Sequence, residues 1–314
     1  MIISASRRSD IPCYYSEWFL NRLKEGCVLI PNPRNANRLG RVVLSPQNVD
    51  CIVFWTKNPA PMLERLSLID GMGYAYYFQF TVTAYGREVE RNLPDKRDIL
   101  DTFKRLSERI GPERVDWRFD PILGFDPALK KEAFPASWIG EQYEKLCRQL
   151  HDYTERCIIS FVDEYPHTRG RAGVLSRNGM LEIAGIISGI AGQYSLPVFS
   201  CAEEIDLSGL GIEHASCIDG QKIGRLIGSR IKARKDPGQR PACGCIESVD
   251  VGAYDTCGNG CTYCYAVTGE KALARRMREH DPESPLLTGF PKGTEIITDR
   301  TAPSGKIDQL SFIE

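Results

Sequence analysis

Short apolar runs alternate with longer amphipathic stretches from residue 1 to about residue 235. The runs are rich in Val, Ile, Phe, Tyr and Trp and are bounded by Gly, Pro, Asp or Asn, which is typical of strands. The predicted strands are Ile2–Ala5, Cys51–Trp55, Ala75–Thr83, Arg114–Phe119, Cys157–Val162, Pro197–Cys201 and, on a weaker pattern, Ala215–Ile218. The predicted helices between them are Ser16–Glu25, Pro61–Ile69, Lys96–Ile110, Ser137–His151, Asn178–Gln193 and Gln221–Ile231.

The helical pattern is clear in Lys96–Ile110, where apolar residues recur at i, i+3, i+4 and i+7 and so share one face. Several β/α units in series require a parallel sheet with helices packed on it. No Gly-x-Gly-x-x-Gly follows a predicted strand, which weakens the case for a doubly wound nucleotide-binding sheet. The sequence therefore predicts an α/β fold, a TIM-like (β/α) barrel that is closed or partial, with roughly six to eight strands.

The character of the chain changes after Lys235. Residues 236–241 have the composition of a linker, and a cysteine-rich segment and a helical run at 268–280 follow. We therefore expect a barrel domain at 1–235. The segment 236–314 would bind a cluster and pack on the mouth of the barrel.

The composition is that of an ordinary globular protein, with 42% hydrophobic residues and a formal net charge of −1. This charge gives no global attraction to nucleic acid or to a membrane surface. No stretch reaches the ~18 apolar residues of a membrane span, and the first ten residues lack a secretory signal pattern. We therefore expect a cytoplasmic protein whose twelve cysteines are reduced. Five of them lie within residues 243–264, and such crowding indicates metal.

Polar side chains gather where the predicted strands end. In a parallel barrel these ends converge on one mouth, where active sites lie. The candidate catalytic residues at these ends are Arg8, Lys57, Arg118, Asp120 and Glu203. One interpretation is a pocket for a polar or anionic substrate. The other is a layer of ion pairs that fills the barrel, such as Arg118 between Asp116 and Asp120, because charges on an inward face are costly unless paired.

Cys257, Cys261 and Cys264 form a C-x3-C-x2-C motif. Three thiolates on one short loop can bind three irons of a [4Fe–4S] cluster and leave the fourth iron open. Gly258 and Gly260 allow a tight turn that brings backbone N–H groups near the sulfides.

This motif resembles the signature of the radical S-adenosylmethionine enzymes, and its Cys-Thr-Tyr-Cys-Tyr-Ala form is similar to the spore-photoproduct-lyase-like branch. The resemblance implies that the open iron binds S-adenosylmethionine, which the reduced cluster cleaves to methionine and a 5′-deoxyadenosyl radical. That radical abstracts hydrogen from a substrate. The resemblance also implies that Tyr263 lies against the adenine and that a reductant such as a ferredoxin or flavodoxin is a partner.

The position of the motif differs from that superfamily, where the cysteine loop follows the first strand of the barrel. No Gly-Gly-Glu-type run for the methionine amine is present either. Over most of its length the chain resembles an uncharacterised prokaryotic family, domain of unknown function 1848. The segments that carry this resemblance are Ser6–Pro12, Trp55–Pro59, Trp117–Ile122 and Cys257–Ala266.

Cys243 and Cys245 form a C-x-C pair with several possible roles. They can support a second metal site or cluster, together with Cys201 or Cys217. They can also add a ligand to the first cluster and close its open iron. A third alternative is tetrahedral zinc bound with Cys261 and Cys264.

The leading functional hypothesis is a radical S-adenosylmethionine-type enzyme with a small-molecule or nucleotide-like substrate. One alternative is an electron-transfer or structural iron–sulfur protein with a closed cluster. The other is a zinc-stabilised nucleic-acid-binding protein that uses the basic stretch from Lys222 to Arg240. The sequence does not identify the substrate.

Overall fold

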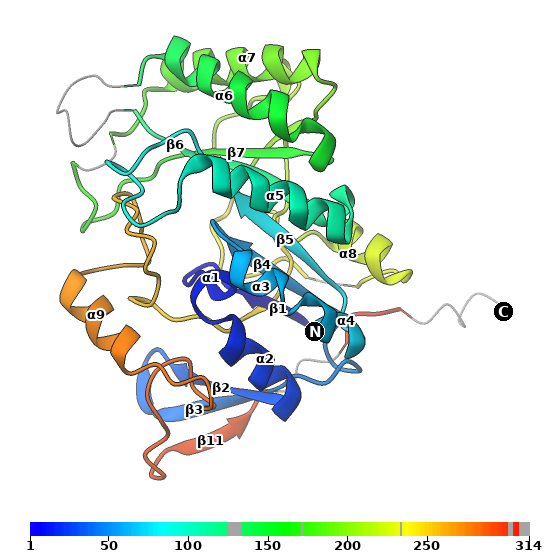
Figure 1. The fold of residues 1–314 in the computed structure, drawn as a ribbon, viewed down its shortest axis with the longest axis vertical. Coiled ribbons are helices and arrows are strands. Elements are labelled where there is room, and N and C mark those ends of the chain that lie inside the picture. Colours follow the sequence, from blue (N-terminus) through cyan, green and yellow to red (C-terminus); the bar gives the residue numbers. More distant parts are fainter. Residues whose placement is uncertain (125–133, 171–172, 233, 301–303, 308–314) are drawn as a thin grey trace, which may run out of the picture.

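The computed structural model describes residues 1–124, 134–170, 173–232, 234–300 and 304–307. Its main element is an eight-stranded sheet in which every neighbouring pair is parallel (Figure 1). In sheet order its strands are β10 (Val249–Asp250), β1 (Ile2–Ala5), β4 (Cys51–Thr56), β5 (Tyr76–Thr81), β6 (Val115–Ile122), β7 (Cys157–Phe161), β8 (Val198–Ser200) and β9 (Glu213–His214). The predicted α/β fold is thus confirmed.

The order of the strands follows the chain from β1 to β9, without the reversal that a doubly wound sheet needs. The exception is β10, which comes from the far end of the chain and pairs with β1, with Ile3 opposite Val249. Segment 236–314 therefore contributes an edge strand to the main sheet.

Nine α-helices are present in the described part of the chain. They are α1 (Ile11–Tyr14), α2 (Ser16–Glu25), α3 (Ala60–Leu63), α4 (Leu66–Gly71), α5 (Lys96–Ile110), α6 (Ala136–Leu150), α7 (Arg177–Gln193), α8 (Gly220–Ile227) and α9 (Glu270–Arg278). The predicted face of α5 is the buried one, with Phe103 and Leu106 fully enclosed. Short 3₁₀ helices cover Pro112–Arg114, His151–Tyr153 and Ser208–Leu210.

Two of the predicted helices are wrong in extent. The single helix predicted at Pro61–Ile69 is two short helices, α3 and α4, with a break at residues 64–65. The helix predicted at Gln221–Ile231 ends at Ile227, because Gly228 adopts the left-handed conformation that terminates helices. The weak strand predicted at Ala215–Ile218 is also misplaced, since β9 ends at His214.

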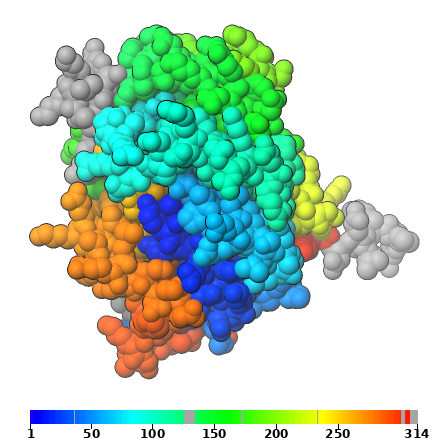
Figure 2. Space-filling view, viewed as in Figure 1, coloured from blue at the N-terminus to red at the C-terminus, as the bar shows by residue number. Residues whose placement is uncertain are grey.

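A three-stranded sheet lies at the opposite end of the molecule from α6 and α7 (Figure 1). It consists of the antiparallel pair β2 (Cys27–Asn32) and β3 (Asn35–Val43), with β11 (Ile296–Asp299) added parallel to β3. The C-terminal segment also packs on α2, where Trp18 Nε1 donates to the Ser284 carbonyl at 2.9 Å. Figure 2 shows this segment in orange beside the blue N-terminal residues.

The two edges of the main sheet, β9 and β10, do not pair with each other in the described residues. Hydrogen bonds nevertheless join the segments next to them. Ile246 N donates to Ile218 O at 3.1 Å, and Ser216 Oγ donates to Gly244 O at 2.7 Å. We call this junction of residues 216–218 with 244–246 the seam.

No helix within the described ranges is both long enough and apolar enough to cross a membrane.

Candidate functional site

A cavity of about 430 Å³ opens at the carboxyl ends of the parallel strands. Its wall includes the ends of β4, β6 and β7 and the segments that follow β1, β8 and β9. The volume lies within the usual range for small-molecule sites. Four of the five candidates from the strand ends line it, namely Arg8, Lys57, Arg118 and Asp120.

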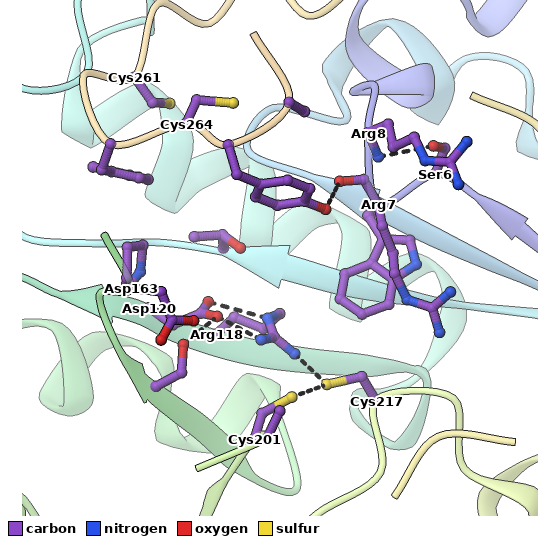
Figure 3. Close-up of a pocket in the computed structure, with 18 of the residues that line it drawn as sticks. Ser6, Arg7, Arg8, Arg118, Asp120, Asp163, Cys201, Cys217, Cys261 and Cys264 are labelled. Atoms are coloured by element: carbon purple, nitrogen blue, oxygen red, sulfur yellow. Dashed lines mark hydrogen bonds and ion pairs between the residues drawn. The ribbon is translucent and has the colours of Figure 1, made fainter. Parts of the chain in front are cut away.

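Seven of the twelve cysteines line this one cavity, and all twelve are free thiols. They form two groups. The loop thiols are Cys257, Cys261 and Cys264, in the loop between β10 and α9. The seam thiols are Cys201, Cys217, Cys243 and Cys245. In Figure 3 the labelled loop thiols lie on one side of the cavity and the labelled seam thiols on the other, with the pair Arg118–Asp120 between them.

Asp10 ties the cysteine loop to the main sheet. Its buried carboxylate accepts hydrogen bonds from the Asn259 side chain at 3.0 Å, from Lys57 N at 2.8 Å and from Cys13 N at 3.1 Å. Burial raises the pKa of Asp10, although these donors oppose the shift. A single carboxyl group therefore joins the ends of β1 and β4 to the loop.

A buried ion-pair network supports the other side of the loop. Lys57 Nζ donates to Glu90 Oε1 at 2.8 Å, and Tyr263 OH donates to the same oxygen at 2.6 Å. Burial alone would raise the pKa of Glu90, but Lys57 and Lys96 hold it below its usual value. Burial would likewise lower the pKa of Lys57, but Glu90 raises it. Lys57 is therefore a fixed positive charge that acts on Cys261.

The two loop glycines are close to other parts of the protein. Gly260 has a φ of +68°, and a Cβ at this position would lie 2.9 Å from the Asn92 side chain. A Cβ on Gly258 would lie 2.9 Å from the Tyr14 ring. Neither glycine lines the cavity, so their small size serves the docking of the loop.

The seam thiols come from three segments of the chain. Cys201 follows β8, Cys217 lies between β9 and α8, and Cys243 and Cys245 precede β10. The sulfur atoms of Cys201 and Cys217 are 2.9 Å apart, and the Cys245 sulfur accepts from Ile218 N at 3.3 Å. Cys245 also contacts the thiols of Cys217 and Cys243.

Arg118 lies at the floor of the cavity. Its guanidinium pairs with Asp120, and its Nη1 donates to Gln79 Oε1 at 3.1 Å and to Cys217 Sγ at 2.6 Å. The Trp55 ring lies 5.2 Å from this guanidinium and 5.4 Å from that of Arg7. Two guanidinium groups thus lie against the Trp55 ring, beside the seam thiols.

The ion-pair layer considered for β6 is only partly formed. Asp120 pairs with Arg118, whereas Asp116 accepts from Lys222 Nζ at 2.6 Å and from Arg156 at 2.8 Å. Lys222 is consequently buried, so the basic stretch that begins there does not form one continuous exposed surface.

Glu203 does not line the cavity, although its Oε1 accepts from Phe161 N at 2.9 Å directly behind the wall. Burial raises its pKa to about 7, partly opposed by this hydrogen bond.

As the side chains stand, no three His, Cys, Asp or Glu side chains in the described ranges are arranged to hold a metal ion. A [4Fe–4S] cluster makes a different demand, because each thiolate binds a different iron and the ligands therefore lie farther apart. The loop thiols have the chemical properties that such a cluster needs. They are three free, half-buried thiols on one cavity, and a fixed cation near Cys261 offsets sulfide charge.

Sequence reasoning did not single out Glu90, Asp10 or Asn259 as functional. Glu90 lies in the irregular segment after β5, where no motif marks it. Asp10 stands with the polar residues at the end of β1, and Asn259 lies inside the cysteine motif itself. These two positions, at a strand end and inside the motif, could have marked Asp10 and Asn259 as site residues.

Comparison with known proteins identifies a family but no activity. No curated protein matches the sequence. Among solved structures, the chain is similar to a "putative alpha-L-fucosidase" from Bacteroides thetaiotaomicron, at 10% identity and a TM-score of 0.29, over 74% of this chain and 81% of that one. A likeness this loose supports no argument. The family described as domain of unknown function (DUF1848) matches residues 2–266, and the chain therefore belongs to that family.

Proposed function

We propose that this protein is a radical S-adenosylmethionine-type enzyme whose loop thiols bind a [4Fe–4S] cluster with one open iron. The observation that carries the proposal is the convergence of Cys257, Cys261 and Cys264, free and half-buried, on one cavity at the carboxyl ends of a parallel sheet. When bound, the cluster and S-adenosylmethionine would together supply a 5′-deoxyadenosyl radical. An external one-electron donor, such as a ferredoxin or flavodoxin, would reduce the cluster.

We further propose that the main sheet is a partial TIM-like barrel. Its sequential strand order and its hydrogen-bonded seam support this interpretation, since the segments beside the two edge strands meet. The parallel register of β10 on β1 supports it as well.

The topology offers a reason for the unusual place of the motif. The loop follows β10, which is the edge strand beside β1. Because the pairing is parallel, the loop emerges at the same end of the sheet as the segment after β1. A cysteine loop at the far end of the chain can thus reach the mouth that an N-terminal loop would occupy.

The residues of the cavity would bind and orient the substrate. Lys57 and Arg118 are held charged by Glu90 and Asp120, respectively, and so offer fixed positive charge to an anionic or polar group. Trp55 offers an apolar surface between Arg118 and Arg7. The cavity therefore fits a small molecule that has both an anionic part and a flat or apolar part.

The test is anaerobic reconstitution with ferrous iron and sulfide, followed by S-adenosylmethionine and dithionite. We expect brown protein that forms methionine and 5′-deoxyadenosine in equal amounts. The variants Cys257→Ala, Cys261→Ala and Cys264→Ala should each lose this product, whereas Cys147→Ala, which changes a buried thiol of α6, should keep it. Iron-loaded, reduced protein that never forms 5′-deoxyadenosine would refute the radical mechanism.

A further inference from the structure

The seam thiols are a second concentration of free cysteines, opposite the loop thiols. Three segments, separated by strands and a helix, bring four thiols to one wall of the cavity. The contacts run from Cys201 to Cys217, from Cys217 to Cys245 and from Cys245 to Cys243. This site involves none of the loop thiols.

Packing alone does not account for this group. Cys217, Cys243 and Cys245 are buried, as are core cysteines such as Cys51 and Cys147, which replace small apolar side chains. The seam thiols instead meet two guanidinium groups, since Arg118 donates to Cys217 and the Arg7 guanidinium faces Cys245. Cations directed at sulfur stabilise thiolates, which are the form that binds metal.

The spacing of Cys201 and Cys217 is that of neither a disulfide nor a filled metal site. Their sulfurs are 2.9 Å apart, which exceeds the ~2.05 Å of a disulfide bond. It is shorter than the ~3.8 Å that follows from tetrahedral zinc with Zn–S bonds of ~2.3 Å. The thiols therefore stand closer together than metal ligands, and binding requires them to separate by rotation of their side chains.

We propose that the seam thiols form a second, four-thiolate metal site that binds either a [4Fe–4S] cluster or a zinc ion. Both occupants need the same chemistry, four thiolates with nearby positive charge. All ligand positions are then filled by protein, so the site has no open position for substrate. It would join the end of β8 and the segment after β9 to the segment before β10, and so fasten the seam.

The test separates the two metal sites by removing the loop thiols. The triple variant Cys257→Ala/Cys261→Ala/Cys264→Ala is reconstituted anaerobically in two arms, one with ferrous iron and sulfide and one with Zn²⁺ alone. We expect about four irons and four sulfides per chain in the first arm, or one tightly held zinc in the second. Loading should also raise Tm by about 5 °C or more, because a metal that binds only the folded chain stabilises it.

Cys217→Ala and Cys245→Ala on this background should each abolish the metal and the Tm shift. Cys51→Ala is the matched control, because Cys51 lies in the same buried apolar cluster and should retain both. Absence of metal in both arms would overturn the proposal, as would metal that survives Cys217→Ala. A Cys201–Cys217 disulfide found by mass spectrometry in metal-free, anaerobically purified protein would overturn it too.

The same measurements on unaltered protein keep the test independent of the folding of the triple variant. Cys217→Ala should lower the iron content by about half, or remove zinc and leave iron unchanged. Failure of the proposed enzymatic function would show instead as iron that does not depend on Cys257, Cys261 and Cys264. The two outcomes are therefore distinguishable.

Discussion

The loop thiols and the seam thiols face the same cavity but are built in different ways. Cys257, Cys261 and Cys264 belong to one short loop, and a carboxyl group on each side, Asp10 and Glu90, holds that loop. The seam thiols come from three segments and meet only when the edges of the sheet meet. The first group depends on the docking of one loop, and the second depends on the fold as a whole.

The charges around the two groups also differ. On the loop side, a lysine is near Cys261 and is fixed by a fully buried glutamate. On the seam side, an arginine donates directly to a thiol and pairs with Asp120, which borders the cavity. We expect loss of the loop-side carboxylate to cost more stability, because Glu90 is 2% exposed whereas Asp120 is 13% exposed.

The largest expected effect is from Glu90→Gln. The change leaves Lys57, which is 13% exposed, and Lys96, which is 31% exposed, without their carboxylate, and we expect a loss of about 3–5 kcal/mol in the free energy of unfolding. Urea unfolding of metal-free protein measures it. Glu108→Gln, on the exposed face of α5, should change stability by less than about 0.5 kcal/mol. Equal effects of the two variants would show that the network does not hold the loop.

Arg118→Gln should have a smaller effect, about 2–3 kcal/mol, because Asp120 borders the cavity and can be reached by water once its partner is gone. The same variant should make Cys217 react with an alkylating reagent at a different rate, since the guanidinium no longer donates to its sulfur. Alkylation followed by mass spectrometry measures this. The control is Arg97→Gln, which changes an exposed residue. A larger loss of stability in Arg118→Gln than in Glu90→Gln would reverse the comparison.

Tyr263→Phe removes one hydrogen bond to Glu90 but leaves the two lysines in place. We expect a loss of about 1 kcal/mol, measured by urea unfolding. Combined with Glu90→Gln, it should add less than its single effect, because both act on one network. If the two losses of stability add fully, Tyr263 does not belong to the Glu90 network.

The smallest effect concerns Glu203, which lies behind the cavity wall and accepts a hydrogen bond from Phe161 N. Burial raises its pKa from the ordinary 4.5 to about 7, so the folded protein holds this proton more tightly than the unfolded chain. This contribution to stability is fully present below about pH 4.5 and is lost as the pH rises through about 7. In Glu203→Gln it should vanish, and stability relative to the unaltered protein should rise between pH 5.5 and 8. If the urea midpoints of Glu203→Gln and of the unaltered protein differ by a constant amount across this pH range, the raised pKa is refuted.

The elements with strong periodicity were predictable from sequence. Helices α2 and α5 have the predicted bounds, because their apolar residues share one helical period. Strand β1 also has the predicted bounds, although its four residues are all buried and show no alternation. Strands β2 and β3 were missed, since Pro31 interrupts the first and many side chains of the second are exposed. Strand β10 has only two residues, and its partner is 246 positions away, which local patterns do not show.

The two thiol groups also differ in how far the sequence predicts them. The loop thiols form a contiguous motif, so their spacing alone predicts that they lie together. Cys201 and Cys217 could be named as possible partners of Cys243 and Cys245, but no spacing in the sequence predicts the contact with Cys245, which depends on the fold. Glu90 was missed because its two lysine partners lie at the end of one strand and the start of a helix, on either side of it in sequence.

The pairing of β10 with β1 has a consequence for the synthesis of the protein. Ser4 bonds to Asp250, so the edge of β1 that faces away from β4 stays unpaired until residue 250 has been translated. Closing so long a loop is slow, and exposed edges invite association with other chains. This edge of the nascent chain therefore depends on the segment that contains β10 for protection. Truncation before residue 249 should yield aggregates during expression, detectable in the pellet after centrifugation, whereas soluble truncated protein would argue against this order of assembly.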